Sequence, residues 1–162
     1  MSNIPISRYS HMFEFNKLCK AVEQMDPVTY GAVITEKSVN IIAALTAITQ
    51  SGKDGLTIYL HFILCSIAAD GKLDEHEFAL LQKSLEASIG HEITYEEAKQ
   101  IFSDAGLDKP AAYKEAVDLM VDILGLVSVE LKTDIILVCL MICAVDGHVS
   151  HKEKKWIKQL IR

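Results

Sequence analysis

Four carboxylates occupy matching places in two short turns of this 162-residue chain. Asp70 lies seven positions before Glu77, and Asp146 and Glu153 repeat that spacing 76 residues later. Clustered carboxylates repel one another unless a cation lies between them, and hard divalent ions such as Ca²⁺ or Mg²⁺ take oxygen ligands of this kind. The four residues therefore predict a site for a divalent metal ion, and Mn²⁺ and Zn²⁺ stay open as alternatives.

The same turns have a second interpretation, in which their polar residues only cap helices. Asp74-x-x-Glu77 and Ser150-x-x-Glu153 both have the form of a capping box. In a capping box the side chain of the first residue accepts the backbone N–H of the glutamate, and the glutamate side chain accepts the backbone N–H of the first residue. The glycine after each aspartate suits the left-handed end of a helix. Under this interpretation only Asp70 and Asp146 have no structural role.

An internal repeat relates the two turns. Leu60–Leu85 aligns with Ile136–Ile161 at a shift of 76, and the matching residues concentrate in the pattern A-x-D-G-x-[LV]-x-x-x-E. Each half predicts a buried helix, a tight turn and an amphipathic helix. We therefore expect two pseudo-repeated helical hairpins that place the turns in equivalent settings.

The segments IAADGKLDEHE and CAVDGHVSHKEKKWI resemble the paired motifs of the tellurite-resistance TerB family, whose helical domain also occurs in membrane-anchored DnaJ-like proteins. The resemblance covers residues 57–162, and residues 1–50 form an N-terminal extension outside it. It implies a small α-helical domain that binds divalent metal through Asp70, Glu77, Asp146 and Glu153. It also implies a stress-response role exerted through protein partners, some of them membrane-associated.

The sequence departs from that family beside each motif glutamate. Family members often carry a further acidic residue there, whereas this chain has His76 and Lys152. Basic residues around the second turn weaken a cation site by direct repulsion. Alternatively His148 and His151, with His76, could bind Zn²⁺ through imidazole nitrogens, or all three could simply be solvated.

The elements that carry these turns are predicted to be helical throughout. No window alternates polar and apolar residues as a strand would. Helices are expected at about 7–25, 38–50, 56–69, 75–89, 94–104, 110–124, 128–145 and 150–162, with 28–35 as a connector. Proline after Asp26, a capping box at Thr94 and glycines at 90, 106 and 125 mark the ends. The expected fold is an all-α bundle of about seven or eight helices in a single domain over residues 1–162.

Composition excludes several classes of protein. The net charge of −6 and the lack of a basic stretch disfavour nucleic acid as a partner. Leu56–Ala69 and Ile135–Val145 are shorter than the ~18–20 apolar residues of a membrane span, so they are expected to be buried core helices. The N-terminus lacks the apolar stretch of a signal peptide, which predicts a soluble cytoplasmic protein. Free, buried thiols are expected at Cys19, Cys65, Cys139 and Cys143.

The functional expectation combines these observations. The sequence contains no G-x-S-x-G, H-E-x-x-H, P-loop or G-x-G-x-x-G motif, so an enzyme is not expected. We expect a non-enzymatic tellurite-resistance or stress-response module that binds a divalent cation through the paired acidic turns and acts through protein partners. The alternative is a pure protein-interaction bundle whose acidic turns are only caps, with Trp156 as an anchor if it is exposed.

Overall fold

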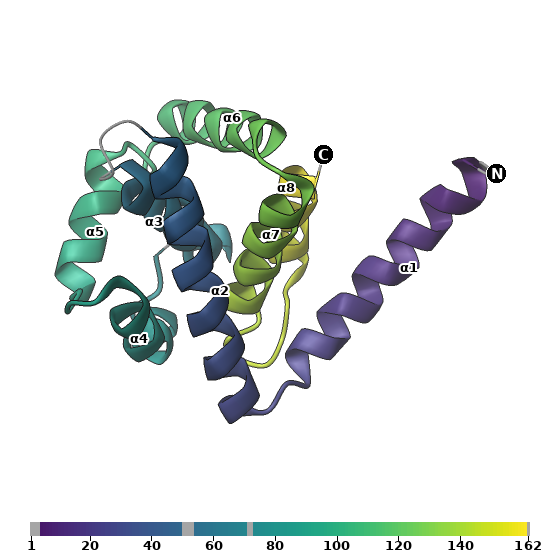
Figure 1. The fold of residues 1–162 in the computed structure, drawn as a ribbon, viewed down its shortest axis with the longest axis horizontal. Helices are drawn as coiled ribbons and strands as arrows, with labels where there is room; N and C mark the ends of the chain where they lie inside the picture. The colour runs from purple at the N-terminus through teal and green to yellow at the C-terminus, as the bar shows by residue number, and fades with distance from the viewer. Residues whose placement is uncertain (1–3, 50–53, 71–72, 162) are drawn as a thin grey trace.

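The computed structural model describes residues 4–49, 54–70 and 73–161, with side chains described from residue 14 onward except those of residues 54 and 70. Over these residues the chain is all-helical and contains no strand. The elements are α1 (Ile4–Glu23), α2 (Pro27–Ile48), α3 (Asp54–Ile67), the short 3₁₀-helix η1 (Ala68–Asp70), α4 (Glu75–Ile89), α5 (Tyr95–Asp104), α6 (Pro110–Leu126), α7 (Val129–Cys143) and α8 (His151–Ile161). The expected single all-α bundle is confirmed (Figure 1).

Helices α3 and α7 form the centre of the bundle, as their apolar character all round predicts. Every residue of 62–67 in α3 and of 138–143 in α7 is buried. The two helices pack directly, because the thiol of Cys139 lies 3.9 Å from the carbonyl oxygen of Phe62 and that of Cys143 lies 3.7 Å from the oxygen of Ser66. Helix α2 packs against α3, α4 and α7, and α8 packs against α7 and η1.

Helix α2 corrects the expected connector over residues 28–35. A single helix runs through that segment, because Asp26 caps it by accepting the backbone N–H of Thr29 at 2.9 Å and Pro27 begins its first turn. The backbone and hydroxyl donors of Thr29 also lower the pKa of Asp26. Burial against neighbouring helices outweighs the weak helix propensity of the β-branched residues.

The helix expected to begin at residue 38 begins eleven residues earlier, so Ser38 lies in the middle of α2 (Pro27–Ile48). It is fully buried, and its hydroxyl shares a hydrogen bond with the hydroxyl of Tyr59 in α3. Serine is common at N-caps, which is why the pattern predicts a helix start at this position. Its partner is distant in sequence, so local pattern could not reveal the correct role.

The remaining helix ends mostly follow the sequence prediction. Gly90 ends α4 with φ of 92°, and Thr94 and Glu97 form a complete capping box at the start of α5. Gly125 was expected to end its helix, but α6 continues through it to Leu126.

Among the described helices, α2 (Pro27–Ile48) is long and apolar enough to cross a membrane by length and composition alone. Ile34, Ile41 and Leu45 of that helix are buried in the bundle.

The two hairpins repeat in the structure at the spacing seen in the sequence. Helices α3 and α7 end at Ile67 and Cys143, and α4 and α8 begin at Glu75 and His151, so both pairs are 76 residues apart. Their surroundings differ, because α4 packs mainly on α2 whereas α8 packs on α7 and η1. The second half of α1 packs on the bundle, where Cys19 and Val22 are buried and the Phe15 ring centroid lies 5.6 Å from Nζ of Lys158 in α8, while the start of α1 projects from the body (Figure 1).

Candidate functional site at the two acidic turns

The first turn joins η1 to α4 beside the bundle core. Asp74 caps α4 by accepting the backbone N–H of Glu77 at 2.9 Å, as the capping interpretation predicts. Leu73 is buried, and its carbonyl oxygen accepts a hydrogen bond of 2.8 Å from the hydroxyl of Tyr95. The side chain of Asp70 and all of residues 71–72 lie outside the described part, so the predicted pairing of Asp70 with Glu77 stays a prediction.

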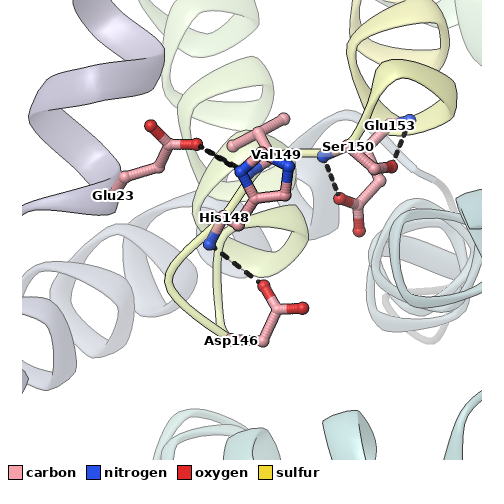
Figure 2. Close-up of polar contacts among 6 residues, drawn as sticks. All are labelled: Glu23, Asp146, His148, Val149, Ser150 and Glu153. Carbon is pink, nitrogen blue, oxygen red and sulfur yellow. Dashed lines mark hydrogen bonds and ion pairs between the residues drawn. The ribbon is translucent and has the colours of Figure 1, made fainter.

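The second turn joins α7 to α8 and is held by its own backbone. Gly147 adopts φ of 90°, and its N–H donates to the carbonyl oxygen of Ala144 at 2.8 Å. Asp146 is exposed and accepts the backbone N–H of His148 at 3.1 Å (Figure 2). Asp146 therefore stabilises the turn that follows it, a role that the sequence pattern did not suggest.

Glu153 completes a capping box at the start of α8. Its carboxylate accepts the backbone N–H of Ser150 at 2.7 Å, and its own N–H donates to the Ser150 hydroxyl at 3.2 Å (Figure 2). Only 2% of Glu153 is exposed, which is exceptional for a glutamate. The buried carboxylate is stabilised by these backbone contacts, so the capping interpretation is confirmed at the second turn.

Glu23 of α1 also belongs to this site, although no sequence pattern predicts it. Its Oε2 atom accepts the backbone N–H of Val149 at 2.7 Å and lies 3.5 Å from Nδ1 of His148 (Figure 2). These partners are 126 and 125 residues away, and nothing in the local pattern around Glu23 indicates them. The N-terminal extension is thereby attached to the second turn.

A metal centre is not assembled among the side chains that the structure describes. No three His, Cys, Asp or Glu side chains among them gather closely enough to hold an ion. His76, His148 and His151 are all exposed. The side chain of Asp70 lies outside the described residues, so a metal site at the first turn stays a prediction.

Two further expectations concern groups in the core. The four cysteines are free and buried, as predicted, and burial raises the pKa of both Cys65 and Cys139 to about 12.

Trp156, which would be an anchor for a partner if it were exposed, is instead buried at 3% exposure. Its indole N–H donates to the Ser66 hydroxyl at 3.0 Å. A docking role for this tryptophan is therefore excluded in the folded chain.

Comparisons of the chain with models of protein families, with curated proteins and with solved structures find no match. The resemblance to the tellurite-resistance family thus depends on the two motifs and their spacing. Within the described residues, these motifs occupy equivalent ends of two buried helices.

Proposed function

We propose that this chain is a non-enzymatic, cytoplasmic stress-response module of the tellurite-resistance type, which binds a divalent cation at its first acidic turn and acts through a protein partner. The observation that supports this function is the repeated hairpin. Two turns of one acidic pattern each follow a buried core helix, and the helix boundaries recur 76 residues apart. A turn fixed at both ends in this way can hold carboxylates in a constant arrangement.

The first turn is the better candidate for the cation. At the second turn, Asp146 and Glu153 are both engaged by backbone N–H groups, and Glu153 is buried. Lys152 and Lys155 are exposed on the first turn of α8 and the one after it, where they repel a cation. We therefore assign the second turn a structural role.

A pure interaction module is the second candidate, and the capping box of Ser150 and Glu153 favours it. If the first turn follows the second, its carboxylates also only stabilise the backbone. Helix α6 offers a surface for a partner, because Leu119 and Leu126 are 61% and 85% exposed and lie two turns apart on one face.

Melting of the full chain separates the two candidates. The melting temperature is measured in EDTA and then in millimolar Ca²⁺, Mg²⁺, Mn²⁺ or Zn²⁺. A cation that binds only the folded state must raise the melting temperature by linkage. If no ion raises it, the cation is excluded from the function and the interaction module takes first place.

Neutral variants locate the site of any such effect. Asp70→Asn and Glu77→Gln keep side-chain size while removing charge, so we expect each to abolish the metal-dependent rise. Without metal they should change the free energy of unfolding by no more than about 0.5 kcal/mol. Asp146→Asn is the matched control at the second turn and should keep the full rise. If Asp146→Asn lost the metal-dependent rise while Asp70→Asn and Glu77→Gln kept it, the assignment to the first turn would be wrong.

A further inference from the structure

The outward side of α8 is basic. Lys152, Lys155 and Lys158 are exposed and recur every three residues, so they lie along one side of the helix. Their ammonium groups make no ion pair with a carboxylate among the residues that the structure describes. Glu153, the one acidic residue of α8, points inward in its capping box and is 2% exposed. We call these three lysines the α8 face, a row of positive charge without a partner in the described part of its own chain.

The neighbouring helix α1 does not neutralise the α8 face. The carboxylate of Glu23 is held by the backbone N–H of Val149 at the second turn. Glu14 is exposed, but exposed Lys17 follows it by three residues, and Lys20 is exposed as well. The second half of α1 therefore carries as many positive as negative charges.

The outward side of α6 has the opposite charge. Glu115, Asp118 and Asp122 are exposed and follow one another at intervals of three and four residues, which places them along one side of the helix. These carboxylates also form no ion pair with a basic side chain in the described ranges. Lys114 is the one basic residue of α6, so the carboxylates outnumber it three to one. We call these three carboxylates the α6 face.

Exposed apolar side chains accompany both rows of charge. On α6, Leu119 and Leu126 are 61% and 85% exposed, and each lies four residues after a carboxylate of the α6 face, Glu115 or Asp122. On α8, Ile161 is 45% exposed and lies three residues after the last lysine of the α8 face. Apolar side chains bordered by charged ones are the usual composition of a protein–protein interface.

We infer that the α8 face of one copy binds the α6 face of a second copy of this chain. The two faces have opposite charge, and both rows extend over about 9–11 Å at 1.5 Å per residue, so three ion pairs can form between the two helices. The exposed leucines of α6 are then shielded from water, which favours association. An anionic membrane would fit the α8 face but would leave the α6 face without a partner, whereas a second copy satisfies both.

This pairing names the occupant of the α6 surface that the interaction-module candidate uses. It does not depend on a cation at the first turn. Melting with divalent ions and the association experiment below can therefore fail independently of one another.

Sedimentation equilibrium of the full chain tests the association. We expect assemblies larger than the monomer in about 0.1 M NaCl, and a dissociation constant at least about tenfold larger in about 1 M NaCl, because the Debye length falls from ~10 Å to ~3 Å. A chain that stays monomeric at about 1 mM protein in the lower salt would overturn the proposal. Binding of such a monomer to phosphatidylserine vesicles would assign the lysines to a lipid surface instead.

Single charge reversals locate the interface. Lys155→Glu should raise the dissociation constant about tenfold or more, because like charges then meet across the interface. Lys83→Glu, at an exposed position on α4, changes the net charge by the same amount and should alter the constant by less than about twofold. Circular dichroism checks that both variants are folded. Equal effects of the two substitutions would mean that net charge, and not the α8 face, controls association.

A mixing experiment tests whether the two faces bind each other. Lys152→Glu with Lys155→Glu makes both faces mainly negative, and Asp118→Lys with Asp122→Lys makes both mainly positive. Each double variant should be monomeric alone, and an equimolar mixture should associate as the unaltered chain does. A mixture that stays monomeric, or association of either folded variant alone, would show that the α8 and α6 faces do not pair.

Discussion

At the scale of single residues, the carboxylates of this chain are distinguished by the backbone groups around them. Glu153 and Asp146 belong to one motif, yet one is buried in a capping box and the other is exposed beside a turn amide. A buried carboxylate is stable only when hydrogen bonds replace the water it loses. The identity of the residue therefore does not by itself define its role.

The buried cap of α8 leads to the first prediction. Glu153→Ala removes the acceptor for the Ser150 N–H, so the free energy of unfolding should fall by about 1–2 kcal/mol. Glu153→Gln keeps an acceptor oxygen and should lose less than half as much. Urea unfolding of both variants measures the difference. Equal losses would mean that the negative charge, rather than the hydrogen bond, stabilises this position.

The thiols provide a second prediction at this scale. Because burial raises the pKa of Cys65 and Cys139 to about 12, both remain protonated at pH 8 and are shielded from reagents. Dithionitrobenzoate should therefore react with them only as fast as the chain unfolds, and with all four cysteines in urea. Rapid reaction of either thiol in the native chain would contradict the buried core described here.

At the scale of elements, α2 and α3 approach so closely that one position requires glycine. A Cβ added at Gly55 would lie 2.5 Å from the backbone nitrogen of Thr46 and 2.8 Å from its Cα. Gly55→Ala should force the helices apart and lower the free energy of unfolding by roughly 1–3 kcal/mol. The control is Gly31→Ala within α2, where an added Cβ meets nothing within 4 Å. This substitution should raise the free energy of unfolding by up to about 1 kcal/mol, because alanine favours the helix more than glycine does. Thermal melting compares the two substitutions.

The attachment of α1 to the second turn yields a prediction for hydrogen exchange. Glu23→Ala leaves the N–H of Val149 without its acceptor, so exchange at Val149 should accelerate about tenfold or more, as expected for a lost charge-assisted bond. Glu14→Ala, at an exposed position on the same helix, should leave that exchange rate unchanged. If the Val149 amide exchanged as slowly in Glu23→Ala as in the unaltered chain, the Glu23 carboxylate would not protect the turn.

At the scale of the whole molecule, the duplicated hairpins share one core. Leu64 and Leu140 occupy equivalent positions in α3 and α7, and both are completely buried. Leu64→Ala and Leu140→Ala should therefore each cost about 2–5 kcal/mol, in one cooperative transition seen alike by circular dichroism and by Trp156 emission. Leu119→Ala, at a 61% exposed position, should change stability by no more than about 0.5 kcal/mol. Separate transitions would mean that the hairpins fold independently.

The tertiary structure also accounts for the errors in the predicted elements. The connector expected over 28–35 is helical because its buried positions, such as Ile34, pack against helices that come later in the chain. Propensity alone favours a break at β-branched residues, but the free energy of burial is larger. Gly125 similarly predicts a helix end, but α6 continues through it to Leu126, since glycine costs only about 1 kcal/mol inside a helix.

The sequence by itself determined the all-helical class, the two buried central helices and the repeat of 76 residues, because these depend on periodicity and local caps. Thr94 and Gly90 act as predicted because their partners lie within four residues. Only the tertiary structure decided that Glu23 holds the second turn and that Trp156 is buried on Ser66. Each of these depends on contacts between segments far apart in the chain, which local spacing does not encode.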